Sequence, residues 1–271
     1  MKTAVIVTTY NRPDALAAVL AGYEAQSTKS FELLVADDGS TSATREVVDR
    51  FSMRAKGSMQ HVWHEDLGFR AAAIRNRALA TSSADYIIFT DGDCVPGRDF
   101  VATHQRLAEP GYFVAGNRVL LSDRFTTETL SKSYSLCHYS SIQWFLARMR
   151  GDINRLSPLI RLPEGGAWRK TSPDRWEGVK TCNVAVWRDD LVRVNGLDET
   201  YSGWGLEDSD LIIRLLHAGV KHKSARCAAP VFHLWHQEND RAGLAENQKR
   251  LDTILASRRV RAEEGLDQYG G

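Results

Sequence analysis

The most informative stretch of this chain is Tyr86-Ile87-Ile88-Phe89-Thr90, which runs directly into Asp91-Gly92-Asp93. Five apolar or β-compatible residues without polar alternation indicate a strand that is buried on both faces, as in a parallel sheet. The glycine between the aspartates lets another group approach the backbone closely. The stretch therefore predicts a central strand with two carboxylates at its carboxyl end, although two aspartates at a strand exit are also ordinary turn chemistry.

The first hundred residues repeat this pattern of a buried strand followed by a helix. Further strands are expected at Ala4 to Thr9, Phe31 to Ala36 and His61 to His64. Helices are expected from Pro13 to about Ala25 (capped by Asn11 or Asp14), from Thr41 to about Phe51, and from Ala71 to Ala80. This alternation predicts an α/β fold with a Rossmann-like, mostly parallel central sheet flanked by helices, which binds ligands at the carboxyl ends of its strands.

Composition excludes several classes of protein. The 271 residues contain 35 Lys or Arg and 34 Asp or Glu, a net charge of +1, which argues against a nucleic-acid partner. The four cysteines, Cys94, Cys137, Cys182 and Cys227, form no CxxC pair, so we expect neither a zinc knuckle nor a disulfide framework. No stretch approaches the roughly 20 apolar residues of a membrane span, and the N-terminal apolar run is too short for a signal peptide. We expect a cytoplasmic protein, and any membrane contact would be peripheral.

After residue 116 the alternation fades. Residues 122 to 163 are predicted to be helical, with one apolar face made by Leu136, Trp144, Phe145, Leu146 and Met149. Residues 148 to 180 contain eight Lys or Arg against four acids, an excess of +4, which indicates either a solvated face or a surface that meets an anionic acceptor or lipid. The tail from Ala242 to about Glu264 is expected to form an amphipathic helix.

The turn after the first strand has neither the GxGxxG pattern of a dinucleotide site nor a P-loop. It reads Thr9-Tyr10-Asn11-Arg12-Pro13. The strand ends instead offer carboxylates, which repel a bare phosphate unless a divalent cation lies between them. A metal-bridged diphosphate is therefore the natural ligand.

Other residues near the strand ends have two possible roles. Asp37-Asp38-Gly39-Ser40 could bind a base or a ribose, or could cap a helix. Arg70 and Arg75 have the planar fork that suits a diphosphate or a uracil carbonyl, but could also lie on a solvated helix face.

The second half adds a glycine-flanked tryptophan, two carboxylates and two histidines. Gly203-Trp204-Gly205-Leu206 offers a flat apolar platform for a sugar ring, and Glu207-Asp208 follows at a predicted helix N-terminus. The helix dipole would keep these carboxylates ionised, although a plain N-cap is the alternative. His233 and His236 could be metal ligands or structural residues.

Taken in order, these motifs resemble the inverting family 2 glycosyltransferases of the GT-A fold, over about residues 3 to 240. The segments that carry the resemblance are Thr8 to Arg12, Asp37 to Ser40, Gly68 to Asn76, Asp91 to Asp93 and Gly203 to Asp208. The second half is also similar to the galactosyltransferase-type carboxyl-terminal region of β-1,4-galactosyltransferases and bacterial chondroitin-polymerase domains, including His236-Gln237-Glu238.

The resemblance implies a role for each matching residue. Donor binding falls to Thr8, Tyr10, Arg12, Asp37, Asp38, Arg70, Arg75, Asp91 and Gly92. Mn²⁺ or Mg²⁺ is implied at Asp93, Asp91 and His236, with His233 as a further candidate. Asp208 is the implied general base, Glu207 its neighbour at the acceptor, and Trp204 and Gly205 shape the acceptor pocket.

The implied function is metal-dependent, inverting transfer of a hexosyl or N-acetylhexosaminyl group. The donor is a UDP-sugar and the acceptor a glycan or a lipid-linked molecule, in bacterial surface polysaccharide or lipopolysaccharide synthesis. Ser209 interrupts the acidic string usual in galactosyltransferases of this type, so the donor sugar is not carried over. The expected organisation is one GT-A domain (1–240), made of a nucleotide-binding half (1–116), a helical, basic insert (117–180) and an acceptor-binding half (181–240), followed by a C-terminal helix and tail (241–271).

Two rival interpretations lack support in the sequence. A nucleotidylyltransferase would carry a Gly-rich, basic phosphate loop between Val7 and Leu20, and none is there. A non-catalytic carbohydrate-binding or degenerate transferase module would be favoured by loss of the paired aspartates, the loop carboxylates or the histidine, and all three are present.

Overall fold

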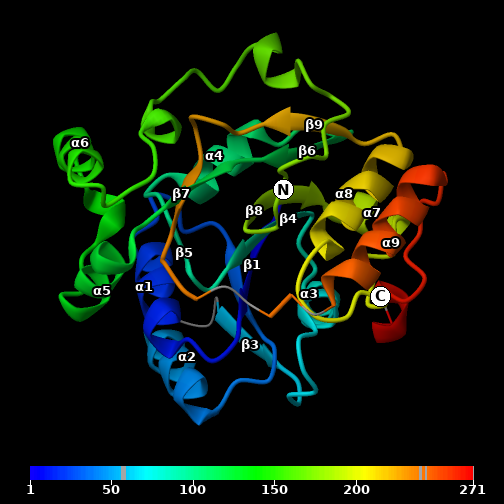
Figure 1. Ribbon diagram of the computed structural model, residues 1–271, viewed down its shortest axis with the longest axis horizontal. Helices are drawn as coiled ribbons and strands as arrows, with labels where there is room; N and C mark the ends of the chain where they lie inside the picture. The colour runs from blue at the N-terminus through cyan, green and yellow to red at the C-terminus, as the bar shows by residue number, and fades with distance from the viewer. Residues whose placement is uncertain (56–58, 238–239, 242, 271) are drawn as a thin grey trace.

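The computed structural model describes residues 1–55, 59–237, 240–241 and 243–270 and contains a seven-stranded and a three-stranded sheet (Figure 1). The strands of the large sheet, in spatial order, are β3 (Met59–Trp63), β2 (Glu32–Asp37), β1 (Thr3–Thr9), β4 (Tyr86–Asp91), β8 (Asn183–Trp187), β6 (Tyr112–Ala115) and β9 (Lys221–Ser224). The small sheet has the order β5 (Cys94–Pro96), β10 (Pro230–His233) and β7 (Asn117–Leu120). The helices are α1 (Pro13–Glu24), α2 (Ser42–Ala55), α3 (Ala71–Thr81), α4 (Phe100–Leu107), α5 (Asp123–Ser131), α6 (Ser141–Met149), α7 (Arg188–Arg193), α8 (Glu207–His217) and α9 (Leu244–Ala256), with short 3₁₀ turns at Leu136–His138, Ser157–Leu159, Ala167–Lys170 and Leu266–Tyr269.

The large sheet is mostly parallel, as predicted. β1 pairs in parallel with β2 and β4, and β8 runs antiparallel between β4 and β6. The register places Thr9 opposite Asp37, and Thr8 opposite Asp91. Three strands therefore end at the same level, which puts their polar carboxyl-terminal residues at one edge of the sheet.

The first strand shows why this sheet is stable between two layers. Val5 and Val7 pack into one hydrophobic cluster with α1, α2 and α4, while Ala4 and Ile6 pack into a second cluster with α3, α7 and α8 (Figure 1). A strand buried on both faces needs apolar residues at every position, which is the pattern that the sequence shows. The predicted strands and helices of the first hundred residues are confirmed.

Asn183, at the start of β8, joins the two sheets. Its buried side-chain amide donates hydrogen bonds to the carbonyl oxygens of Asn117 (3.0 Å) and Ala229 (2.7 Å). Its Oδ1 lies 3.0 Å from His104 Nε2 on α4. Asp93 directly precedes β5 and His233 ends β10, so this amide helps to fix the small sheet relative to the candidate site.

The predicted caps of α1 are wrong. Arg12 occupies the N-cap position without a side-chain cap bond, and Pro13 stands in the first turn. Asn11 Oδ1 instead accepts a hydrogen bond from the Thr41 amide, and Asp14 pairs with Arg12. The proline, whose fixed φ suits a helix start, takes the place of a polar cap.

The insert is less helical than predicted. Only α5, α6 and two single 3₁₀ turns lie within residues 122–163. The single apolar face is also wrong: Leu136 and Trp144 are buried, while Phe145, Leu146 and Met149 are exposed. Trp144 stacks on Phe232 with ring centroids 4.3 Å apart, so this face of α6 packs on the small sheet and the opposite face remains outside.

The tail is also less helical than predicted. Its helix α9 ends at Ala256, and Leu266–Tyr269 forms a 3₁₀ turn that packs against α3. Ala242, where the helix was expected to begin, lies outside the described residues. Within the described part of the chain, no helix combines the length and the apolar character needed to cross a bilayer.

Replacing Asn183 with alanine is expected to lower the free energy of unfolding by about 2–4 kcal/mol. The substitution leaves two buried carbonyls and the His104 ring without their partner, and each unsatisfied group carries a desolvation penalty. Urea denaturation measures the change. Gln248→Ala, on the exposed side of α9, should stay within about 0.5 kcal/mol of the parent, and an equal stability of Asn183→Ala would contradict the linking role.

Candidate active site

Arg75 on α3 connects three separate segments of the candidate site. Its buried guanidinium donates to Thr8 Oγ1 (2.9 Å), to Asp91 Oδ1 (3.1 Å) and to Glu207 Oε1 (3.2 Å). Burial acts to lower the pKa of Arg75, but the carboxylates of Asp91 and Glu207 outweigh it and raise that pKa. The guanidinium thus stays charged and connects β1, β4 and the N-terminus of α8.

Burial raises the pKa values of two carboxyl groups next to Arg75. Burial raises the pKa of Asp91 to about 6, Arg75 opposes this shift and Asp93 adds to it. Burial, followed by the charge of Asp208, also raises the pKa of Glu207. Loss of water thus outweighs the helix N-terminus in its effect on the pKa of Glu207.

Both carboxylate oxygens of Asp37, and both of Asp38, have a hydrogen-bond partner. Asp37 accepts from the Ser40 amide (2.9 Å) and contacts His61 Nε2 at 2.9 Å. Asp38 accepts from the Arg70 amide (2.8 Å) and lies 2.6 Å from His64 Nε2.

No motif in the sequence marks His61 and His64 as site residues. The pairing of strands places them there: β3, which contains His61, lies parallel beside β2, with Trp63 opposite Asp37. Parallel strands end together, so both histidines belong at the edge where Asp37 and Asp38 emerge.

The remaining donor candidates surround these aspartates. Tyr10 is half exposed and its hydroxyl donates to Asp66 Oδ2 (2.9 Å), whereas Arg12 is engaged by Asp14 (3.0 Å). Gly92 donates its amide to Thr8 O (2.7 Å), and a Cβ at this position would lie 2.8 Å from Thr9 Cβ. The close backbone approach expected at Gly92 is therefore present.

Asp93 lies between the two histidines. Its Oδ2 is 3.2 Å from His236 Nε2 and 3.7 Å from His233 Nε2. The hydrogen bond to Asp93 raises the pKa of His236, while burial lowers the pKa of His233. Burial acts to raise the pKa of Asp93, but these histidines outweigh it and hold the pKa below its usual value.

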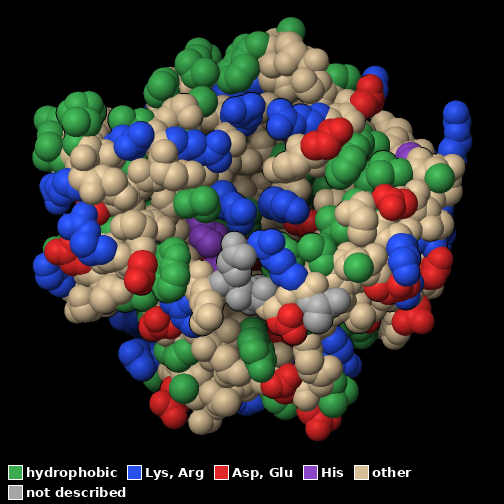
Figure 2. All heavy atoms as spheres, in the orientation of Figure 1, with side chains coloured by type: hydrophobic (Ala, Val, Ile, Leu, Met, Phe, Trp, Pro, Cys, Tyr) green, Lys and Arg blue, Asp and Glu red, His purple; other side chains and the backbone are tan. Residues whose placement is uncertain are grey.

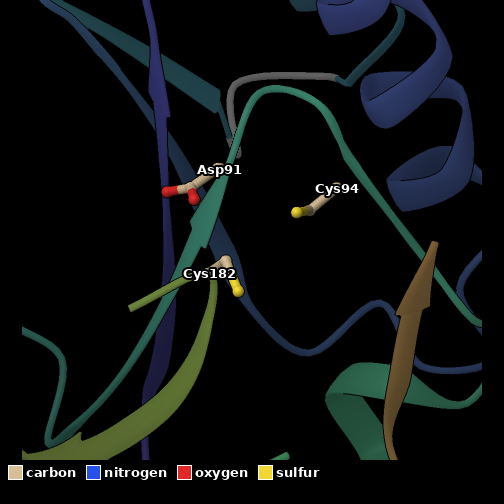
Figure 3. Close-up of side chains that lie close together, drawn as sticks. All are labelled: Asp91, Cys94 and Cys182. Atoms are coloured by element: carbon tan, nitrogen blue, oxygen red, sulfur yellow. The ribbon is translucent and has the colours of Figure 1, made fainter. Parts of the chain in front are cut away.

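Two cysteines lie beside this group. Cys94, Cys182 and Asp91 each offer one ligand atom within 4.8 Å of the others, and their side chains lie close together in Figure 3. Cys94 Sγ also donates to Asp93 Oδ1 (3.3 Å), and burial raises the pKa of its thiol well above the usual range. No spacing pattern in the sequence indicates this pair, because the pairing of β4 with β8 brings Cys182 next to Asp91.

The loop that precedes α8 has an unusual backbone. Gly203, Gly205 and Leu206 have φ values of 70°, 106° and 76°, and Leu206 is a non-glycine residue in the left-handed region. Buried Asn247 on α9 donates to the carbonyls of Ser202 (3.1 Å) and Gly205 (3.0 Å). The C-terminal helix therefore holds this loop in place, a role that the sequence did not indicate.

Trp204 lies in this loop, and Asp208 follows in the first turn of α8. The Trp204 ring is partly exposed and lies 5.4 Å from the guanidinium carbon of Arg241. Asp208 Oδ1 accepts from the Ser209 amide (2.8 Å) and lies 3.4 Å from Lys180 Nζ. The sequence pattern assigns Lys180 only to the basic run. Glu238 lies outside the described residues.

Comparison with known proteins decides the family. Residues 4–170 match the family model "Glycosyl transferase family 2", and residues 169–237 match "N-terminal domain of galactosyltransferase".

The chain belongs to glycosyltransferase family 2.

Curated relatives agree with this assignment. Validoxylamine A glucosyltransferase of Streptomyces hygroscopicus subsp. jinggangensis is 32% identical over 227 residues, which cover 80% of this chain and 51% of that protein. Chondroitin synthase of Escherichia coli is 26% identical over 247 residues, which cover 86% of this chain and 34% of that protein. The family 2 chain thus spans about half or less of these relatives.

Solved structures show the same fold. Staphylococcus aureus TarS residues 1–349 in complex with UDP has a TM-score of 0.64 at 13% identity, covering 99% of this chain and 68% of that one. The mannosyltransferase PcManGT of Pyrobaculum calidifontis in complex with GDP-Man and Mn²⁺ also has a TM-score of 0.64, at 17% identity, covering 94% and 64%. The predicted GT-A architecture is confirmed.

One face of this GT-A fold is hollowed near its centre, with histidine and Lys or Arg side chains along the edge of the hollow (Figure 2). At the candidate site the structure brings Thr8, Arg75, Asp91 and Glu207 into direct contact, and groups Asp93 with His233 and His236.

Replacing Arg75 with methionine is expected to destabilise the protein by about 3–5 kcal/mol near neutral pH. Removing one partner of a buried ion pair leaves the remaining carboxylates uncompensated. Without the guanidinium the pKa values of Asp91 and Glu207 rise further, so the folded variant takes up protons more readily as the pH falls. The loss relative to the parent should therefore shrink from about pH 8 to about pH 5.

Denaturant titrations across this pH range test the Arg75 prediction. Arg75→Lys keeps the charge without the planar fork, and its loss of stability should be smaller and depend less on pH. A penalty for Arg75→Met that is the same at every pH would show that the ion pairs are not its cause.

Proposed function

We propose that this chain transfers a sugar from a UDP-sugar to a hydroxyl of a glycan or lipid-linked acceptor, with inversion at the anomeric carbon. The proposal rests on the three hydrogen bonds that Arg75 donates to Thr8, Asp91 and Glu207. These bonds hold the end of β1, the end of β4 and the start of α8 together at one edge of a family 2 fold. Donor-side and acceptor-side groups are thereby held close together. A single direct displacement requires that arrangement.

The donor side is assigned to the ends of β1 and β2. Asp37 and Asp38 present carboxylate oxygens that can accept from a base N–H or a ribose hydroxyl, and Tyr10 offers an exposed ring beside them. Arg70 and Arg12 are the proposed diphosphate contacts, while Arg75 positions Asp91. Structural neighbours with bound UDP, UDP-GlcNAc or GDP-Man support a nucleotide-sugar donor.

The metal is assigned to Asp93 with His236, assisted by Asp91 and with His233 as a further ligand. A carboxylate and imidazoles form a donor set that suits Mn²⁺, and Mg²⁺ is the alternative. A buried thiol that donates a hydrogen bond to Asp93 helps to orient the carboxylate. When bound, such an ion would offset the negative charge that develops on the departing UDP.

The acceptor side is assigned to the loop before α8. Asp208 would take the proton of the acceptor hydroxyl, with Lys180 and the Ser209 amide keeping its Oδ1 oriented. Glu207, held by Arg75, would lie beside it and contact the acceptor. Trp204 and Gly205 would shape the pocket for the sugar ring.

The biological setting belongs to the same proposal. Relatives include the chondroitin synthase of Escherichia coli and the hyaluronan synthase of Pasteurella multocida, whose names denote polysaccharide synthesis. We place this chain in bacterial surface polysaccharide or lipopolysaccharide synthesis, in the cytoplasm at the inner face of the membrane. Residues 1–116 would bind the nucleotide, residues 181–240 the acceptor, and the insert of 117–180 would select the acceptor.

UDP is expected to raise the melting temperature of the protein in a Mn²⁺-dependent way. A ligand at a hundred times its Kd stabilises the folded state by about 2.7 kcal/mol. Differential scanning fluorimetry with UDP, GDP, CMP, dTDP and NAD, each with and without Mn²⁺, measures the preference. Asp93→Asn should abolish the Mn²⁺ dependence and Asp49→Asn, exposed on α2, should retain it; no shift with any nucleotide would contradict the donor site.

Asp208→Asn is expected to lower turnover by about 10²–10⁴-fold, because a positioned general base contributes on that scale. UDP affinity should be unchanged, since Asp208 is assigned to the acceptor. Release of UDP from the preferred donor, with and without acceptor, measures turnover. Asp189→Asn, in the exposed first turn of α7, is the matched control; unchanged turnover of Asp208→Asn would exclude it as the base.

A further inference from the structure

Helix α6 carries an apolar stripe that no part of the described chain covers. Ile142, Phe145, Leu146 and Met149 have exposed fractions of 72%, 54%, 43% and 70%. Their spacing of three and four residues places them on one face of the helix. The opposite face, with Trp144 and Ala147, packs on the core, so α6 is apolar on both sides.

More exposed apolar side chains follow in the same insert. Ile160, Leu162 and Trp168 are exposed, although each belongs to a short segment without regular helix. Figure 2 shows hydrophobic side chains gathered over α6 at the upper left and along the upper rim of the face that contains the central hollow. Clustered apolar residues of this kind mark an interaction surface rather than ordinary solvent exposure.

The charge around the stripe has one sign. Residues 141–162 contain four arginines and one aspartate, a net charge of +3. The arginines, all exposed, are Arg148, Arg150, Arg155 and Arg161. The single acid, Asp152, is buried and paired with Arg124.

The basic run of residues 148–180 is therefore two different features. In its second part, buried Arg169 donates to backbone carbonyls such as Ser224 O (2.7 Å), and Lys170 pairs with Glu109 (2.6 Å), while Arg175 is exposed. In its first part all four arginines are exposed, and they belong to the same segment as the apolar stripe.

We propose that the α6 stripe and these four arginines form a membrane-docking surface that binds the interface of an anionic lipid bilayer. An interfacial helix places apolar side chains at the level of the acyl chains, while flanking arginines contact lipid phosphates. A second copy of the chain fits this surface less well, because a symmetric contact would bring two sets of four arginines together.

Docking in this way would bring the rim of the candidate site to the membrane, where a lipid-linked acceptor is presented. This consequence rests on the proposed function, whereas the binding itself does not. The two can therefore be tested apart, with vesicle binding measured in the absence of any nucleotide.

The test is sedimentation of the full chain with vesicles that contain phosphatidylglycerol and with vesicles of phosphatidylcholine alone. The parent should bind the anionic vesicles preferentially, and added salt should weaken the binding. Phe145→Ser with Met149→Ser should lower the partition coefficient at least about tenfold. Arg148→Gln with Arg150→Gln should lower it about 25-fold, or about fivefold for each arginine.

Met53→Ser is the matched control, because Met53 is 79% exposed on α2, outside the insert. It should bind as the parent does, and circular dichroism should show that all variants are folded. Equal binding to both vesicle types, or equal binding of the stripe variant and the parent, would overturn the proposal. So would a dimer in sedimentation equilibrium that the stripe variant dissociates while the parent fails to bind vesicles.

Discussion

A buried arginine among carboxylates is the interaction on which the rest of this site depends. Asp91 and Glu207 leave water when the fold forms, and each would be costly to keep ionised without a nearby cation. Arg75 supplies three directed hydrogen bonds from one planar group, which a lysine could not match. The same contacts tie together parts of the chain that lie 67 and 132 residues away from Arg75.

Two further polar residues connect outer parts of the fold to the segments around Arg75. Asn183 connects the large sheet to the small one, from which Asp93 and His233 approach the site. Asn247 connects α9 to the strained loop in front of Glu207. Both side chains are buried and donate to backbone carbonyls, so two amide groups help to fix the positions of the segments around the candidate site.

The insert of residues 117–180 is held by different interactions. Its packing on the core is local and aromatic, with Trp144 against Phe232, and its outer face is free of the constraints that shape the sheet edge. Apolar and basic side chains can therefore accumulate there without disturbing the polar edge of the sheet.

The sequence by itself determined the strands, the helices of the first half and the level at which the aspartates emerge. Buried parallel strands require continuous apolar runs, such as Tyr86 to Thr90, and these are local signals. The partners of Arg75, the histidines beside Asp37 and Asp38, and the contact of Cys182 with Cys94 depended on the tertiary structure. So did the outward face of α6, because helical periodicity shows which residues share a face but not what covers it. Contacts between distant segments arise from sheet pairing and helix packing, which no local pattern encodes.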